Sequence, residues 1–180
     1  MTRMLRLLSQ FLLLVYVIVL IKFVVFKDMD MILVGRMRFY FGGIQTGPGN
    51  WVPFKTIFGY FLGNKGTLIA GLNLVGNLAL LFPLGFLLAN RFPQLRRNQV
   101  FILALLVSLS IEFAQLQLRV GIFDVDDIIL NSIGLVLGYY FHRLIPHKFI
   151  LPFTLAFGIL FVGCLVYYLS HSVPMTEPVP

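Results

Sequence analysis

Long apolar runs, separated by short polar stretches, constrain this chain more than any other feature of its sequence. A helix that crosses the hydrocarbon core of a bilayer needs about 20 predominantly apolar residues, because it rises ~1.5 Å per residue. Five runs reach or approach that length, at residues 5–26, 67–90, 98–118, 125–145 and 149–169. We therefore predict an all-α membrane protein, a bundle of about five transmembrane helices in a single domain over residues 1–180.

The composition excludes a soluble protein of the same length. Hydrophobic residues make up 59% of the chain and charged residues 12%, which is more apolar side chain than one soluble core can bury. The net charge of +7 would suggest a nucleic acid partner in a soluble chain. Here the basic residues lie mainly between and beside the apolar runs, where they contact anionic head groups and set orientation. We expect membrane lipids as partners, no nucleic acid, and a multi-pass topology with the amino terminus in the cytoplasm.

Residues 27–66, between the first two apolar runs, are turn-forming in part and rich in aromatic side chains. Trp51, Phe54, Ile57, Phe58 and Phe61 recur at spacings of three and four, which is the period of an amphipathic helix. We predict a short helix here that lies in the membrane interface or re-enters the bilayer, and that covers the end of the bundle.

Polar side chains also occur inside the apolar runs or at their ends. A charged side chain that faces lipid costs roughly 2.5–3.5 kcal/mol on insertion scales, so such groups usually face the bundle interior and mark function. Spacings of three and four place these residues on one face of each helix. They are Asn73 and Asn77 in the second run, Glu112, Gln115 and Arg119 in the third, and Asp127 and Asn131 in the fourth.

Three of these polar residues fall at one shared depth, and Asn77 alone lies deeper, near the midplane. The second run begins, the third ends and the fourth begins on the same membrane side. At ~1.5 Å per residue, Asn73, Glu112 and Asn131 each lie about 9 Å from that side. We therefore predict a polar site inside the bundle near one membrane face.

The same residues could instead have purely structural roles. Amides inside membrane bundles often only hydrogen-bond neighbouring helices, and Glu112 with Arg119 would suit a structural ion pair. We interpret Asp124 and Asp126 as a solvated helix start that interacts with the helix dipole, and Asp127 as the inward carboxylate.

Other residues are interpreted as packing features. Pro83 and Gly85 predict a kink in the second run. Gly134 and Gly138 allow a neighbouring helix to approach closely, and would also suit a homo-oligomer. Cys164, the single cysteine, is assigned to packing, and the three histidines lack the four-residue spacing of a zinc-binding helix. We expect neither a metal nor a cofactor.

Four blocks carry the most distinctive residue combinations: NWVPFKTI at 50–57, NLVGNLALLFPLG at 73–85, IEFAQ at 111–115 and RVGIFDVDDIILNSIGLVLG at 119–138. In this order they resemble the VanZ-like family of bacterial membrane proteins, over about residues 50–140. The resemblance implies a bacterial cell membrane and a link to resistance to teicoplanin, a glycopeptide that binds cell-wall precursors. It also implies characteristic polar positions at Asn50, Asn73, Asn77, Glu112, Gln115, Arg119, Asp127 and Asn131.

Two functional hypotheses follow, with a weaker third. In the first, an envelope protein binds a head group or a lipid-linked envelope precursor, with Arg119 on a phosphate or carboxylate and Glu112 and Asp127 on Arg119 or a ligand amine. In the second, Glu112 or Asp127 is the general base of a membrane enzyme that transfers an acyl or phosphoryl group to a lipid or wall precursor. A channel or carrier has less support, because no internal repeat is visible.

Overall fold

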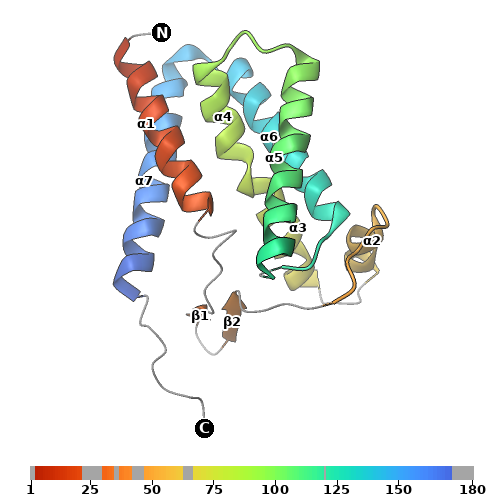
Figure 1. Ribbon diagram of the computed structural model, residues 1–180. Coiled ribbons are helices and arrows are strands. Elements are labelled where there is room, and N and C mark those ends of the chain that lie inside the picture. Colours follow the sequence, from red (N-terminus) through yellow and green to blue (C-terminus); the bar gives the residue numbers. More distant parts are fainter. Residues whose placement is uncertain are drawn as a thin grey trace.

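The computed structural model describes residues 3–21, 30–34, 37–41, 47–62, 67–119 and 121–171. Its long helices form an upright bundle, in which α1 begins and α7 ends at opposite ends (Figure 1). The helices are α1 (Arg3–Leu20), α2 (Lys55–Phe61), α3 (Thr67–Leu80), α4 (Phe82–Arg91), α5 (Arg97–Leu118), α6 (Val125–Leu144) and α7 (His147–His171). Outside the bundle, strands β1 (Asp30–Val34) and β2 (Met37–Phe41) pair as an antiparallel hairpin.

The helical prediction is confirmed, and the helix bounds follow the apolar runs closely for α5, α6 and α7. Helix α1 ends at Leu20, and residues 22–26 of the first predicted run lie outside the described residues. A short helix, α2, forms in the aromatic segment as expected. Two stretches in the described part are long and apolar enough to cross a membrane, Leu74–Arg91 and Arg97–Gln117.

The second apolar run is divided into two helices rather than one kinked helix. Helix α3 ends at Leu80, and α4 begins at Phe82 after Leu81. Pro83 lies in the first turn of α4, where its missing N–H and fixed φ are tolerated. The proline therefore marks the start of a helix, and the break falls slightly earlier than its position.

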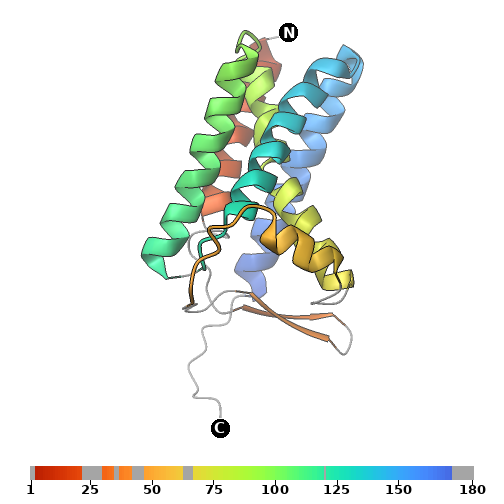
Figure 2. The same ribbon diagram turned by 90° about the vertical axis from the view of Figure 1, so that its right-hand side faces the viewer.

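Helix α6 packs against α3, α4 and α5, and it lies between α5 and α7 in the view of Figure 2. Glycines make the approach to α3 and α4 unusually close. A Cβ added at Gly134 would overlap the carbonyl oxygen of Leu78, and one at Gly138 would overlap that of Phe82. The expected role of these two glycines in close packing is confirmed, and the neighbouring helices belong to the same chain.

The hydrophobic core lies where α4 meets α6. Leu81, Phe86, Leu87, Leu135 and Tyr139 are all fully buried there. By contrast, much of the surface of α5 is covered by exposed apolar side chains, namely Phe101, Ile102, Leu105, Leu106, Leu109 and Phe113. An exposed apolar surface of this extent is typical of contact with lipid or with another protein.

Candidate functional site

The predicted polar residues gather where α5 ends and α6 begins. Helix α5 ends at Leu118, the φ of 56° places its C-cap residue Arg119 in the left-handed region, and the chain then reverses into α6. The segment before α2 is held beside this reversal by a short parallel bridge. In it the Asn50 N–H donates to the Phe123 carbonyl at 2.8 Å, and the Val125 N–H donates to the Asn50 carbonyl at 3.0 Å. The rings of Trp51 and Phe123 stack with centroids 4.2 Å apart.

Asp126 holds the beginning of α2 from the first turn of α6. Its side chain is fully buried, and it accepts backbone N–H groups from Phe54, from Thr56 at 2.7 Å and from Ile57 at 3.1 Å. The interpretation of Asp126 as a solvated helix start is therefore wrong. The aromatic segment folds back over this carboxylate and removes it from solvent.

Asp124 does begin α6, but it also has partners in the same segment. Its carboxylate accepts the Asp126 N–H at 2.8 Å, as an N-cap residue does. It further accepts the Asn50 amide at 2.9 Å and the Thr56 hydroxyl at 2.7 Å. Because Asn50 also donates to Thr56 at 2.9 Å, these three side chains form a closed hydrogen-bonded ring.

Glu112 lies on the inner face of α5 and is 2% exposed. Its Oε2 accepts the backbone N–H of Asp124 at 3.2 Å, which fixes the distance between the end of α5 and the start of α6. Arg119, the other member of the alternative ion pair, is exposed at the end of α5. Gln115 is half-buried and packs against Gly121 in the reversal.

Asp127 and Asn131 extend the polar face of α6 into the bundle. The Asp127 carboxylate accepts the side-chain amide of Asn77, which joins α6 to α3. Asn131, one turn further on, is 2% exposed, and its Oδ1 has no hydrogen-bond partner within the described residues. Asn73 lies in α3, but its side chain is outside the described residues.

We call the polar cluster the group formed by Asn50, Thr56, Asn77, Glu112, Asp124, Asp126, Asp127 and Asn131. The structure thus brings together Asn50, Asn77, Glu112, Asp127 and Asn131 of the predicted residues, and it places Gln115 and Arg119 at the edge. Sequence reasoning missed the contributions of Thr56, Asp124 and Asp126. A carboxylate at a helix start usually caps its own helix, so the sequence carried no indication of their other partners.

The polar cluster is rich in hydrogen-bond acceptors and contains four carboxyl groups but no basic side chain among its described members. Such a site suits a group that donates hydrogen bonds, an ammonium or a hydroxyl. No set of histidine, cysteine and carboxylate residues in the described ranges has the arrangement of a metal site.

Comparison with known proteins yields one match. The sequence model of the VanZ/LLP1 family matches residues 13–146, which include the whole polar cluster. No curated protein and no solved structure matches the chain significantly.

Proposed function

Because the chain belongs to the VanZ/LLP1 family, we propose that it is a multi-pass protein of the bacterial cell membrane that binds a lipid head group, or a lipid-linked envelope precursor, in its polar cluster. The family and the apolar helices indicate a membrane protein. The identity of the ligand and its place in the fold are inferred from the cluster itself.

The proposed topology has five crossings, formed by α1, α3 together with α4, α5, α6 and α7. The short connections at one end of the bundle carry Arg91, Arg96, Arg97, Arg143 and Lys148, which favours the cytoplasm for that end and for the amino terminus. The polar cluster then lies near the outer leaflet. Trp51 and Phe58, 67% and 62% exposed, would anchor the segment around α2 in the outer interface.

Asn131 carries the binding proposal. A buried amide oxygen without a hydrogen-bond partner costs roughly 1–3 kcal/mol, and such groups are rare in folded proteins. A ligand N–H or O–H would satisfy the Oδ1 of Asn131, which lies one turn from the Asp127 carboxylate. Asp127 and Glu112 favour a ligand ammonium, and Arg119, exposed at the end of α5, is placed to meet the ligand phosphate from the edge.

The first test replaces Asn131 with leucine. Because Asn131 Oδ1 has no partner in the described residues, Asn131→Leu should fold normally while binding about tenfold less ligand. The measurement is native mass spectrometry of lipids and lipid-linked precursors that co-purify with the protein. Arg119→Ala should lose ligand in the same way. At equal protein levels, cells with either variant should tolerate less teicoplanin than cells with the original chain.

Gln117→Leu is the matched control, because it removes an exposed amide near the same end of α5 and should retain all of the ligand. If Asn131→Leu and Arg119→Ala, both folded, carry as much ligand as Gln117→Leu, the polar cluster is not the binding site.

A membrane enzyme acting on the same ligand is the second candidate, and the burial of Glu112 favours it. A carboxylate that is 2% exposed inside a polar cluster resembles a general base in its surroundings. If Glu112 is a base, Glu112→Gln and Glu112→Ala should both lose at least about 100-fold in the transfer rate. Mass spectrometry of envelope lipids from expressing cells measures the product. A modified lipid that persists at the full rate in Glu112→Gln excludes this role.

A further inference from the structure

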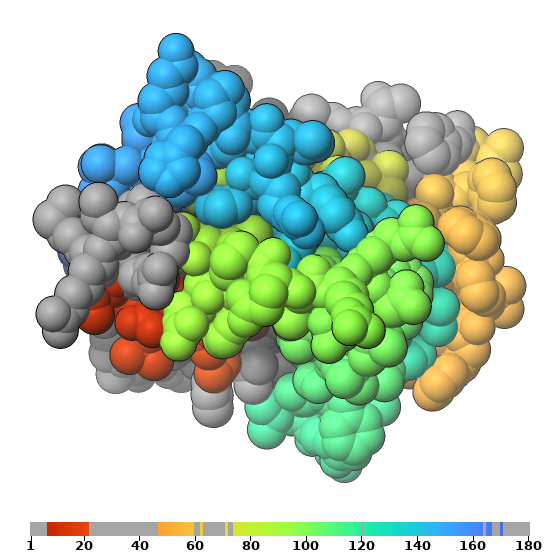
Figure 3. All heavy atoms as spheres, turned by 90° about the horizontal axis from the view of Figure 1, so that it is seen from above, coloured from red at the N-terminus to blue at the C-terminus, as the bar shows by residue number. Residues whose placement is uncertain are grey.

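We propose that the end of the bundle opposite the polar cluster holds a second binding site, which takes a hydroxyl-bearing phosphate ester. A cavity of about 410 Å³ opens there between the ends of α4 and α6 and the beginning of α7. Figure 3 looks onto this end, where the connection from α4 to α5, in light green, lies beside the blue beginning of α7. The site is independent of the proposed function, because it shares no residue with the polar cluster.

Two buried polar side chains in the cavity wall have atoms without partners. His142 of α6 is 9% exposed, and neither of its ring nitrogens has a hydrogen-bond partner in the described part of the chain. Asn90 of α4 is 1% exposed; its amide nitrogen donates to Ser9, but its Oδ1 has no partner within the same ranges. Three unpaired polar atoms in one wall indicate a ligand rather than a packing defect.

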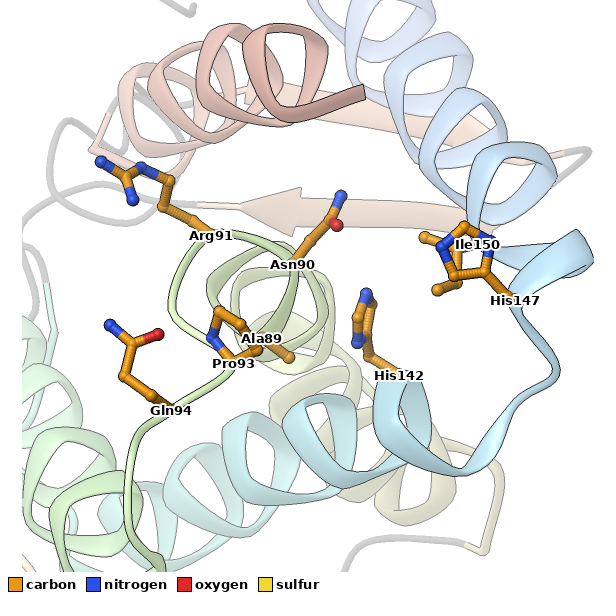
Figure 4. A pocket seen from close by; sticks show the side chains of 8 residues that line it. All are labelled: Ala89, Asn90, Arg91, Pro93, Gln94, His142, His147 and Ile150. Atoms are coloured by element: carbon orange, nitrogen blue, oxygen red, sulfur yellow. The ribbon is translucent and has the colours of Figure 1, made fainter. Parts of the chain in front are cut away.

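The orientation of these side chains supports a shared ligand. In Figure 4, Asn90 and His142 extend side by side into the same space, and His147 of α7 lies next to them. Phe86 packs against the imidazole of His142 with ring centroids 4.9 Å apart, which holds the ring in place. Arg91 and Gln94 line the cavity from the other side of α4.

The donors and acceptors in the wall define the class of ligand. Arg91 and one nitrogen of a neutral imidazole donate, whereas Asn90 Oδ1 and the other ring nitrogen accept. No carboxylate lines the cavity among the described residues, so an anion meets no repulsion there. A phosphate ester with a hydroxyl group satisfies both kinds of partner, since its phosphate accepts from Arg91 on one side of α4 while its hydroxyl group bonds to the imidazole and Asn90 on the other (Figure 4).

Two sources supply this chemistry, and the experiment separates them. One is the head group of phosphatidylglycerol, and the other is soluble glycerol 3-phosphate. The full chain is placed in nanodiscs of phosphatidylcholine, whose quaternary ammonium has no hydrogen to donate. In one arm phosphatidylglycerol is added and retained lipid is measured by native mass spectrometry; in the other, glycerol 3-phosphate is titrated by calorimetry.

We expect binding in at least one arm, weakened about tenfold by His142→Phe and by Arg91→Ala. Arg97→Ala is the matched control, because Arg97 is an exposed cation at the same end of the bundle and does not line the cavity. His142→Phe removes two unpaired nitrogens and keeps a ring, so its unfolding midpoint should be unchanged or higher. If it fails to fold, Arg91→Ala at the half-buried rim decides the test.

Binding of phosphatidylglycerol supports the membrane as the source, and binding of glycerol 3-phosphate supports the soluble source. The proposal is overturned if neither compound binds. It is equally overturned if folded His142→Phe and Arg91→Ala bind as the original chain does, or if Arg97→Ala weakens binding to the same extent.

Discussion

Replacing Gly138 with alanine should reduce the yield of folded protein sharply, although alanine is normally the better helix former by about 1 kcal/mol. The added Cβ would overlap the backbone carbonyl oxygen of Phe82. A backbone atom in a packed helix cannot rotate away, so α6 would have to move from α4, with which it forms the centre of the core. Overpacking costs typically 1–3 kcal/mol and more when the backbone must shift, which is a large part of the stability of a domain.

Gly76→Ala provides the matched control, because a Cβ at this helical position meets nothing within 4 Å. Helix propensity therefore predicts that Gly76→Ala leaves the stability of the protein unchanged or raises it slightly. Packing predicts that Gly138→Ala lowers the stability. Size-exclusion chromatography of both variants, followed by their unfolding midpoints in detergent, measures the difference. Equal midpoints for the two variants would contradict the close approach of α4 and α6.

Replacing Asp126 with alanine should loosen the beginning of α2 against α6. The backbone N–H groups of Phe54, Thr56 and Ile57 would all lose their acceptor. Hydrogen bonds to a charged group contribute roughly 1.5–3 kcal/mol each, whereas the contacts of α2 with α3 and the hydrogen bonds from Asn50 and Thr56 to Asp124 would remain. Hydrogen exchange at residues 54–57 should therefore accelerate by at least about 100-fold, whereas exchange in α7 stays the same.

The neighbouring Asp127→Ala is the control for this experiment. The Asp127 carboxylate accepts from Asn77 of α3 rather than from the backbone around α2, so exchange at residues 54–57 should stay slow. Asp126→Asn keeps one acceptor oxygen and should give an intermediate rate. Slow exchange in Asp126→Ala would show that other contacts hold the segment.

The helices of this protein were predictable because their causes are local. Apolar length alone placed α5, α6 and α7 within a few residues, and glycine spacing on α6 indicated its close contacts. For α3 and α4, the sequence predicted a kink in one helix but not its division into two helices. Pro83 indicates a disturbance of the helix. Whether the chain bends or begins a new helix there depends on what packs against it, which here is α6, in close contact at Gly85 of α4 and through its own Gly138.

In the polar cluster, too, some features follow from the sequence and others only from the tertiary structure. The sequence by itself determined that Glu112 and Asn131 lie at one level and that both, with Asp127, face inward, because helical rise and the cost of polar groups in lipid are properties of each segment. The partner of Asp126 was decided only by the tertiary structure. Thr56 lies 70 residues before it. Neither the hydrophobic period nor the composition of a segment predicts which distant backbone N–H groups a buried carboxylate will contact. That choice depends on how the whole chain packs, which also left Asn131 Oδ1 without a partner in the described residues.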